Sequence, residues 1–358
     1  MGSPFEVDLR TSGQRRQWVA EFEKTSTRRA ILGTNQWAES VATHLEIEYF
    51  IDDFRTETQF LGKPVVPVSL ASSDVMTLST ALLRPMTARR VLQSTVRSHL
   101  DYYSFLKFAS IPALPISFLS DREVWAPKSA NRLTAVRDRL FDAESVDVWD
   151  RIVRLRRDFD IEAMVVFSDR EESQYFESFV KLESGQTFLD VGGFDGFTTQ
   201  SAINKYGREV ECHIFEPNAQ MIPILSSKFS SFSNVRVHEF GLSSFTGNIQ
   251  FEVNGSSSRA GVGTISVPVR ALDELELSSA DLVKVDIEGG EEAFLQGASQ
   301  TIQSLQPQLV IACYHRNEQL VSIFEKVLPL MPDSRVYIRH FTEGFPETDI
   351  FFIPPRFW

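Results

Sequence analysis

From residue 187 onward, short apolar runs alternate with amphipathic segments. Apolar runs of strand length occur at residues 187–191, 210–215, 235–239, 282–286, 308–313, 335–340 and 349–353. Amphipathic segments that predict helices lie between most of them, at residues 198–206, 219–229, 291–297 and 318–328. This alternation predicts a parallel sheet with helices on both faces. The loop between the last two strands is too short for a parallel crossover, which takes about a dozen residues, so we expect an antiparallel hairpin there.

The start of the chain has a shorter pattern of the same kind. A strand, a helix and a second strand are predicted at residues 28–33, 37–45 and 47–53. Such a unit binds dinucleotides when a glycine-rich turn follows the first strand and an acid lies about 20 residues further on. Asp52 meets the second condition, but Gly33 stands alone where the fingerprint has three glycines, and Asn35 and Trp37 crowd the place of the pyrophosphate. A structural or partner-binding role is therefore favoured here over nucleotide binding.

Between these two regions the pattern suggests a connector. A proline-punctuated linker at residues 111–115 follows the first α/β unit, and residues 130–182 carry helix-like segments, the last of them at 175–180. Within the second region, residues 247–270 are predicted to form an inserted β-hairpin with its turn around Asn254. We predict four parts in all: an N-terminal extension at 1–26, a Rossmann-like accessory domain at 27–108, a helical connector at 109–182 and a second α/β domain at 183–358.

Composition and charge narrow the class of partner. The 358 residues carry a formal net charge of −12, which argues against nucleic acid or an anionic membrane as the main partner. No apolar run reaches the roughly 18 residues of a membrane span, and the first residues lack the basic and apolar regions of a signal peptide. Cys212 and Cys313 lie in strand-like runs, so we expect buried free thiols and a reducing, cytoplasmic compartment.

Polar residues follow several of the predicted strands, and ligands bind at such strand ends in open α/β sheets. After the strand at 187–191 comes a turn in which Gly192, Gly193 and Gly196 let the backbone approach a ligand closely. Asp190 can order this turn or accept a hydrogen bond from a ligand's ammonium group. Taken alone, a structural glycine turn is the common alternative.

The next two strand ends add groups that suit a nucleoside. Glu216 ends the second strand, 26 residues after Asp190, and a carboxylate there can accept from both hydroxyls of a ribose. The alternative for Glu216 is a helix cap or a surface carboxylate. Gly241 and Leu242 follow the third strand, at a position that can flank an adenine.

The fourth strand end is acidic. Asp286 and Glu288 lie two residues apart at the end of an apolar strand, so we expect their side chains on the same side. Clustered carboxylates can bind a divalent metal or act as a general base, whereas the alternative is an acidic helix start. His315 follows the neighbouring strand and can share the site as a general base, with a structural role equally open. Tyr175, Arg259 and Arg316 are candidate contacts for a substrate.

Three segments together resemble the FkbM family of S-adenosylmethionine-dependent methyltransferases: Phe-Leu-Asp-Val-Gly-Gly-Phe-Asp-Gly-Phe-Thr at 188–198, Phe-Glu-Pro-Asn at 215–218 and Leu-Val-Lys-Val-Asp-Ile-Glu-Gly-Gly-Glu at 282–291. Residues 267–275 are similar to the family's segment before the acidic motif, and the resemblance covers about residues 170–353. It implies a class I methyltransferase fold and methyl transfer to an oxygen, typically a hydroxyl of a sugar or natural product. Gly193 stands where the family often has alanine.

We therefore predict an α/β protein with a class I methyltransferase sheet, closed by an antiparallel C-terminal hairpin, and an N-terminal Rossmann-like domain. The hypothesis for its function is an S-adenosylmethionine-dependent O-methyltransferase acting on a sugar, glycan or natural product, with Asp286, Glu288 and His315 as catalytic residues. The residues predicted to bind the cofactor are Asp190, Gly192, Gly193, Phe194, Asp195, Gly196, Thr198, Glu216, Pro217, Asn218, Gly241, Leu242 and Asp286. Metal dependence and assembly into a homo-oligomer are left open. Two rivals are a degenerate methyltransferase fold that only binds ligands and an oxidoreductase that binds NAD through the N-terminal domain.

Overall fold

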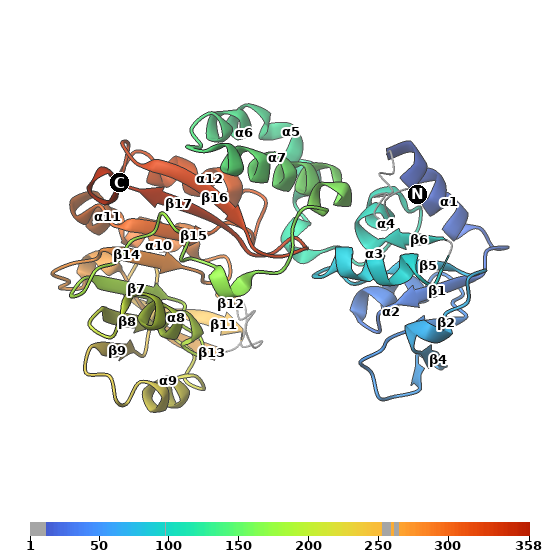
Figure 1. The fold of residues 1–358 in the computed structure, drawn as a ribbon, viewed down its shortest axis with the longest axis horizontal. Coiled ribbons are helices and arrows are strands. Elements are labelled where there is room, and N and C mark those ends of the chain that lie inside the picture. Colours follow the sequence, from blue (N-terminus) through green and yellow to red (C-terminus); the bar gives the residue numbers. More distant parts are fainter. Residues whose placement is uncertain (1–11, 97, 253–258, 261–264) are drawn as a thin grey trace, which may run out of the picture. The chain divides into compact units, whose positions relative to one another are not determined.

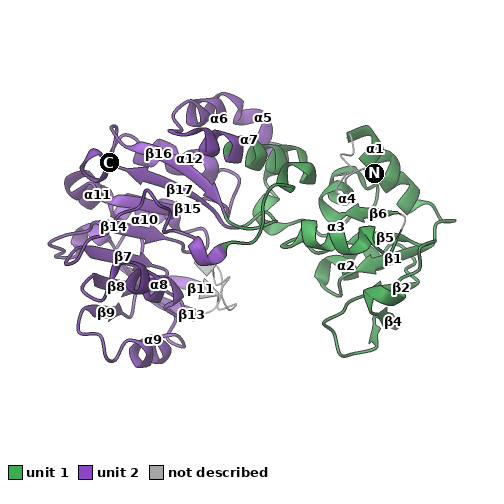
Figure 2. Cartoon of the chain, in the orientation of Figure 1, with its two compact units in different colours: residues 1–123, 149–170, 341–346 green, residues 124–148, 171–340, 347–358 purple. Residues whose placement is uncertain are grey.

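The chain folds into two compact units, which are coloured separately in Figure 2. The computed structural model describes residues 12–96, 98–252, 259–260 and 265–358. Unit 1 comprises residues 1–123, 149–170 and 341–346, and unit 2 comprises residues 124–148, 171–340 and 347–358. Two helices, α5 (Arg122–Lys128) and α7 (Ala143–Asp158), contribute residues to both units. The domain limits at 27, 109 and 183 stay a prediction. Among the described helices, none has the length and apolar character that a membrane crossing requires.

Unit 1 contains a six-stranded sheet in the order β3-β4-β2-β1-β5-β6. Its strands are β1 (Arg29–Leu32), β2 (Tyr49–Ile51), β3 (Gln59–Phe60), β4 (Lys63–Val66), β5 (Met76–Ser79) and β6 (His99–Asp101), and its helices include α1 (Ser12–Glu23), α2 (Gln36–Ala42), α3 (Pro85–Gln93) and α4 (Tyr102–Phe108). The strands pair in parallel except for β3 with β4. The predicted strand–helix–strand unit is therefore present as β1, α2 and β2.

The turn after β1 is closed by side chains of unit 1 itself. The side-chain oxygen of Asn35 accepts hydrogen bonds from the backbone N–H groups of Trp37 and Ala38, and so caps the N-terminus of α2. Gly33 has φ +110°, and a Cβ there would clash with the hydroxyl of Thr80. The cap occupies the donors that a pyrophosphate uses in a dinucleotide-binding unit.

Unit 2 is built on a seven-stranded sheet in the order β16-β17-β15-β14-β7-β8-β9 (Figure 1). Its strands are β7 (Thr187–Val191), β8 (Glu211–Phe215), β9 (Val235–His238), β14 (Leu282–Val285), β15 (Gln308–Ala312), β16 (Arg335–His340) and β17 (Thr348–Ile353). The first five pair in parallel, whereas β17 pairs antiparallel with both β15 and β16. The predicted fold class is confirmed, including the antiparallel end of the sheet.

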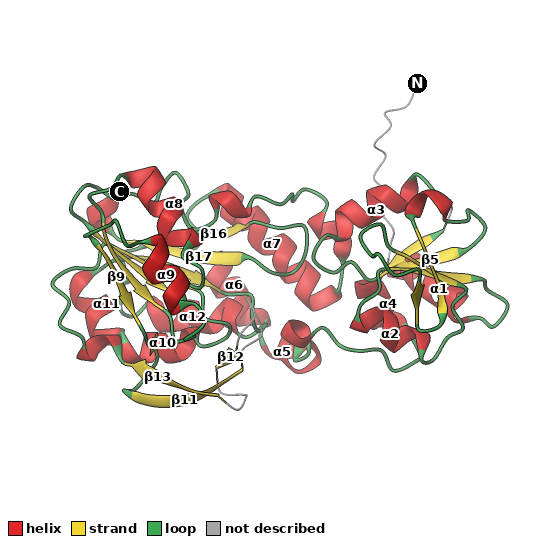
Figure 3. Ribbon diagram, turned by 90° about the horizontal axis from the view of Figure 1, so that it is seen from below, coloured by secondary structure: helices red, strands yellow, loops and turns green. Residues whose placement is uncertain are grey.

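Helices cover both faces of this sheet. They are α8 (Phe197–Tyr206), α9 (Ile222–Lys228), α10 (Glu291–Gly297), α11 (Ser299–Leu305) and α12 (Gln319–Val327), and a further helix, α6 (Ala130–Arg137), packs against α12. Figure 3 shows α8 and α9 on one side of the sheet and α10, α11 and α12 on the other. Every residue of β7, β14, β15 and β17 is buried, because a strand covered on both faces has no side that meets water.

A second, four-stranded sheet is inserted between β9 and β14. It has the order β10-β13-β11-β12, with β10 (Gly241–Leu242), β11 (Gly247–Glu252), β12 (Arg259–Ala260) and β13 (Ile265–Arg270). Strands β11 and β13 pair antiparallel, as the hairpin prediction requires. The turn predicted around Asn254 lies outside the described residues.

The helix predicted at 175–180 is wrong, because these residues form turns and irregular backbone. Tyr175 has φ +70°, in the left-handed region that no helix residue adopts. Its hydroxyl donates a hydrogen bond of 2.7 Å to Asp286, and the ring of Phe176 packs edge-on against Phe188. Tertiary contacts therefore outweigh the amphipathic pattern of this segment.

Candidate active site

A cavity of about 660 Å³ opens at the carboxyl ends of the central strands of unit 2. Its wall is formed by the turns that follow β7, β8 and β14, together with β10 and several residues of the segment 171–176. This is the edge at which open α/β sheets bind their ligands. A cavity of this size is in the range of small-molecule sites, which run from about 300 to 1,000 Å³.

Most of the residues singled out from the sequence meet in the lining of this cavity. Those in the lining are Tyr175, Gly192, Gly193, Phe194, Asp195, Thr198, Glu216, Pro217, Asn218, Gly241, Leu242, Asp286 and Glu288. Asp190, Gly196, His315 and Arg316 lie outside the lining. The half-exposed side chain of Arg316 donates hydrogen bonds to Gly289 O and to Glu292. These bonds connect the turn after β15 to the turn after β14 and to the start of α10. The side chain of Arg259 is outside the described part of the chain.

The glycine turn packs directly on the acidic turn. Gly192 has φ +84°, and a Cβ at this position would clash with the backbone carbonyl oxygen of Asp286. Gly193 has no such φ, but a Cβ there would clash with Cγ2 of Ile214. Both positions require glycine for space, and the alanine that is frequent in the family at 193 does not fit this arrangement without a shift of Ile214.

We expect Gly192→Ala to lower the melting temperature more than Gly185→Ala. Both positions have positive φ, +84° and +78°, so an alanine at either is strained by about 1–2 kcal/mol. Only Gly192 adds a clash, because nothing lies within 4 Å of a Cβ at Gly185. Thermal unfolding of the two variants measures the difference. Equal losses of stability would contradict the close packing of the two turns.

Asp190 lies beneath the cavity and not in its lining. One carboxylate oxygen accepts from the hydroxyl of Thr199 at 2.7 Å, and the other lies 3.1 Å from Nζ of Lys284. The Lys284 ammonium also donates to Gly192 O at 2.7 Å. Asp190 therefore acts on the turn through Lys284. The sequence analysis allowed either an ordering of this turn or a contact with a ligand's ammonium group, and the contacts of Asp190 in the structure are of the first kind.

Lys284 itself was missed by sequence reasoning. Burial would lower its pKa, but the charges of Asp190 and Asp286 outweigh that effect and raise it. The signal in the sequence was a lysine in the middle of the apolar strand Leu282–Val285, since a buried lysine is found almost only where an acid pairs with it.

Glu216 is buried, and its carboxylate lines the cavity. Its two oxygens accept 2.8 Å hydrogen bonds from the backbone N–H groups of Phe194 and Asn218. Burial raises its pKa, although these two backbone bonds act in the opposite direction. Because an ionised carboxylate has about four acceptor sites, two remain for the hydroxyls of a ribose. The bond to Phe194 also joins the first two strand ends into one surface.

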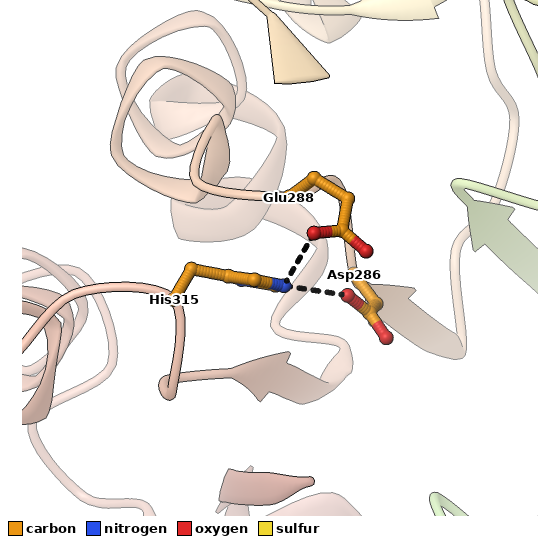
Figure 4. Close-up of side chains that lie close together, drawn as sticks. All are labelled: Asp286, Glu288 and His315. Atoms are coloured by element: carbon orange, nitrogen blue, oxygen red, sulfur yellow. Dashed lines mark ion pairs between the residues drawn. The ribbon is translucent and has the colours of Figure 1, made fainter. Parts of the chain in front are cut away.

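Figure 4 shows Asp286, Glu288 and His315 grouped at the acidic strand end. Nε2 of His315 lies 3.5 Å from Oδ1 of Asp286 and 3.4 Å from Oε2 of Glu288. On the other side of the ring, Nδ1 lies 3.1 Å from Oε1 of Glu291. Oδ2 of Asp286 accepts from the hydroxyl of Tyr175 at 2.7 Å. The histidine is thus enclosed by three carboxylates, of which Asp286 and Glu288 face the cavity.

This enclosure changes the pKa of each member. Burial alone would lower the pKa of His315, but Glu291, Asp286 and Glu288 together raise it to about 9. Burial raises the pKa of Glu288 to about 8, although His315 works against the rise. Burial would also raise the pKa of Glu291, but the His315 charge and hydrogen bonds lower it overall.

Two further acids and an amide near this group were missed by sequence reasoning. Nε2 of Gln174 donates to Glu347 at 2.7 Å and to Asp349 at 3.1 Å. Burial and the charge of Asp286 raise the pKa of Glu347 to about 7, and burial with the charge of Glu347 raises that of Asp349 well above its ordinary value. An aspartate inside the apolar strand Thr348–Ile353 was the signal for Asp349.

Comparisons with known proteins identify a domain within unit 2. Residues 190–339 match the family model described as methyltransferase FkbM domain. The fold is similar to a crystal structure of methyltransferase FkbM from Methylobacillus flagellatus KT, with a TM-score of 0.77 and 20% sequence identity over 96% of this chain and 94% of that chain. No curated protein matches the chain.

Two weaker structural matches cover about half of the chain. One is precorrin-6y C5,15-methyltransferase from Geobacter metallireducens GS-15, with a TM-score of 0.34 and 14% identity over 53% of this chain and 94% of that chain. The other is Aeropyrum pernix fibrillarin in complex with S-adenosyl-L-methionine, with a TM-score of 0.34 and 9% identity over 51% of this chain and 71% of that chain. The family model alone assigns a methyltransferase FkbM domain to residues 190–339, and this domain makes the protein an S-adenosylmethionine-dependent methyltransferase.

Proposed function

We propose that the protein transfers the methyl group of S-adenosylmethionine to a hydroxyl oxygen of a sugar, glycan or natural product. The observation that carries this proposal is one cavity whose lining holds a nucleoside-type carboxylate, Glu216, and two further carboxylates, Asp286 and Glu288. Glu216 suits the ribose of the methyl donor, and Asp286 and Glu288 suit an acceptor hydroxyl that must lose a proton. A nucleic-acid acceptor is disfavoured by the net charge of −12.

The cofactor fits the glycine turn and the residues after β8. Gly192 and Gly193 line the cavity and carry no side chain, so a ligand can approach their backbone closely. Glu216 would accept from the ribose hydroxyls, and Gly241 with Leu242 would flank the adenine. When bound, S-adenosylmethionine supplies an electrophilic methyl group on its sulfonium.

Methyl transfer requires the hydroxyl oxygen to attack the methyl carbon in line with the breaking carbon–sulfur bond, with loss of the hydroxyl proton. Asp286 and Glu288 would receive this proton, because they line the cavity. His315 lies behind them and outside the lining, so we assign it a positioning role in place of the predicted role as base. Tyr175 would hold Asp286 in place through its hydroxyl.

The acceptor is open to direct test. A screen of neutral sugars, glycans and hydroxylated natural products with methyl-labelled S-adenosylmethionine is expected to yield a methyl ether and S-adenosylhomocysteine. Calorimetric titration with both forms of the cofactor is the companion measurement. Failure of the protein to bind either form would favour a degenerate fold that no longer transfers methyl groups. We further propose a cytoplasmic location, because Cys212 and Cys313 are buried free thiols.

Glu216→Ala is expected to weaken binding of S-adenosylmethionine by more than about tenfold. Each hydrogen bond to a charged group contributes about 1.5–3 kcal/mol, and the change removes the acceptor for both ribose hydroxyls. Calorimetric titration of the variant measures the loss. The matched control is Glu239→Ala, an exposed carboxylate after the next strand, which should bind like the unmodified protein. Unchanged affinity of Glu216→Ala would refute the ribose assignment.

A further inference from the structure

We propose that Asp286, Glu288 and His315 bind a divalent cation beside the methyl-transfer position. The inference deepens the proposed function and rests on it for the cation's role, while the site itself rests on geometry. These side chains each offer one ligand atom, and the three atoms lie within 4.8 Å of one another. Figure 4 shows the three side chains pointing toward one another from two different turns.

The spacing suits a bound ion better than direct hydrogen bonds. Nε2 of His315 lies 3.5 Å from Asp286 and 3.4 Å from Glu288, beyond the 2.7–3.2 Å typical of N–H···O bonds. Ligand bonds of about 2.1 Å place neighbouring ligands about 3.0 Å apart in an octahedral shell and about 3.4 Å apart in a tetrahedral one. The two distances from Nε2 therefore match those between neighbouring ligands of one ion, and the three ligand atoms all lie within 4.8 Å of one another.

The histidine is held as metal-binding histidines are held. Its Nδ1 lies 3.1 Å from a carboxylate oxygen of the fully buried Glu291. That same oxygen accepts from the backbone N–H groups of Ile287 and Gly289, and Gln319 donates to the second oxygen. A carboxylate fixed in this way on one ring nitrogen directs the other nitrogen to a metal. Here the directed atom is Nε2, which faces Asp286 and Glu288.

Asp286 provides an independent observation. Its Oδ2 accepts from the hydroxyls of Tyr175 and Tyr314, at 2.7 and 3.4 Å. Its Oδ1 is a buried atom with no hydrogen-bond partner among the described residues. Nε2 of His315 lies 3.5 Å from it, beyond the usual length of an N–H···O hydrogen bond. This oxygen is the one that faces His315, so a cation at the proposed position would satisfy it.

The ligand set and its exposure indicate which ion binds and what it meets. One imidazole nitrogen and two carboxylate oxygens suit a first-row divalent ion such as Mn²⁺ or Zn²⁺. Three protein ligands leave coordination positions open, as catalytic metal sites do. Asp286 and Glu288 line the cavity, so the open positions face it. The class of ligand expected there is the hydroxyl oxygen of the acceptor.

A cation in this place would assist the proposed reaction. An oxygen bound to a divalent ion loses its proton more readily. The new bond then forms between that oxygen and the methyl carbon, the carbon–sulfur bond breaks with its electron pair left on sulfur, and the proton passes to a carboxylate oxygen that does not bind the ion.

The test is direct metal binding by the full chain after removal of metals with a chelator. Free Mn²⁺ is followed by electron paramagnetic resonance during titration, and Zn²⁺ by calorimetry. We expect one tight site per chain for either ion. His315→Ala and Asp286→Asn should weaken it by at least tenfold, and Glu291→Gln by about tenfold or more through loss of orientation. The control Glu171→Gln/Glu172→Gln, in the same cavity lining, should bind metal normally.

The inference is overturned if neither ion binds, or if His315→Ala binds both ions as tightly as the unmodified protein. Titration of the same variants with S-adenosylhomocysteine separates this result from a failure of the proposed function. If the unmodified protein binds S-adenosylhomocysteine but no metal ion, only the cation site is refuted. If the unmodified protein does not bind S-adenosylhomocysteine, the methyl-transfer proposal is refuted, whatever the metal result.

Discussion

Asp286→Asn is expected to slow methyl transfer by about 10²–10⁴-fold, the usual contribution of a general base. The asparagine keeps the size of the side chain and an oxygen that can accept from the hydroxyl of Tyr175, so the fold should be retained. It removes the negative charge at the point where the acceptor's proton leaves. The measurement is the rate of label transfer from S-adenosylmethionine to an acceptor found in the screen.

Tyr175→Phe is the matched control for this prediction. It leaves the Asp286 carboxylate in place and removes one hydroxyl that donates to it, so we expect a loss of less than about tenfold, as for one neutral hydrogen bond. Calorimetry with S-adenosylhomocysteine should show that Asp286→Asn still binds the product. A turnover of Asp286→Asn close to that of the unmodified protein would remove Asp286 from the mechanism.

Lys284→Met is expected to lower the free energy of unfolding by about 3–5 kcal/mol, the range seen when one partner of a buried ion pair is removed. Asp190 is completely buried, and the Lys284 ammonium 3.1 Å away is the cation paired with it. Methionine fills much of the same volume, so the loss reports the charge of Asp190 left behind. Chemical denaturation measures this change.

The double variant Asp190→Asn/Lys284→Met tests the cause. With both charges removed, we expect it to be more stable than Lys284→Met alone, because a neutral amide is less costly to bury than an unpaired carboxylate. Lys181→Met, at an exposed lysine, controls for the loss of a lysine as such and should change stability little. Additive losses in the double variant would contradict a direct ion pair.

The sheet of unit 2 was predictable because each of its strands can be recognised from a short stretch of sequence. Strands buried on both faces must be apolar along their whole length, so β7, β14 and β15 are visible as apolar runs. The antiparallel orientation of β17 relative to β16 could be predicted from the length of the loop between them, which is too short for a parallel crossover. By contrast, the segment at 175–180 was predicted as a helix from its amphipathic pattern. Such a pattern carries no information about distant contacts, and here Tyr175 has a left-handed conformation and donates a hydrogen bond to Asp286.

The residues of the candidate site also fall into those that the sequence predicted and those that it did not. Residues at strand ends, such as Glu216 and Asp286, were predictable because a strand end in an α/β sheet has a known place at the ligand edge. Lys284 and Asp349 were not, because a charged side chain inside an apolar strand acquires a role only from what packs against it. Glu347, in the loop just before β17, was missed for the same reason. Gln174 lies far along the chain from Glu347 and Asp349, and only folding brings them within hydrogen-bond distance.

The sequence by itself determined the alternation of strands and helices, the family of the second domain and the turns that carry the candidate ligands. Each of these depends on residue type and on spacing along the chain. Only the tertiary structure decided that Asp190 lies beneath the cavity on Lys284, and that His315 is enclosed by Asp286, Glu288 and Glu291. Charge interactions depend on distance and burial in space, and neither can be read from separation along the chain.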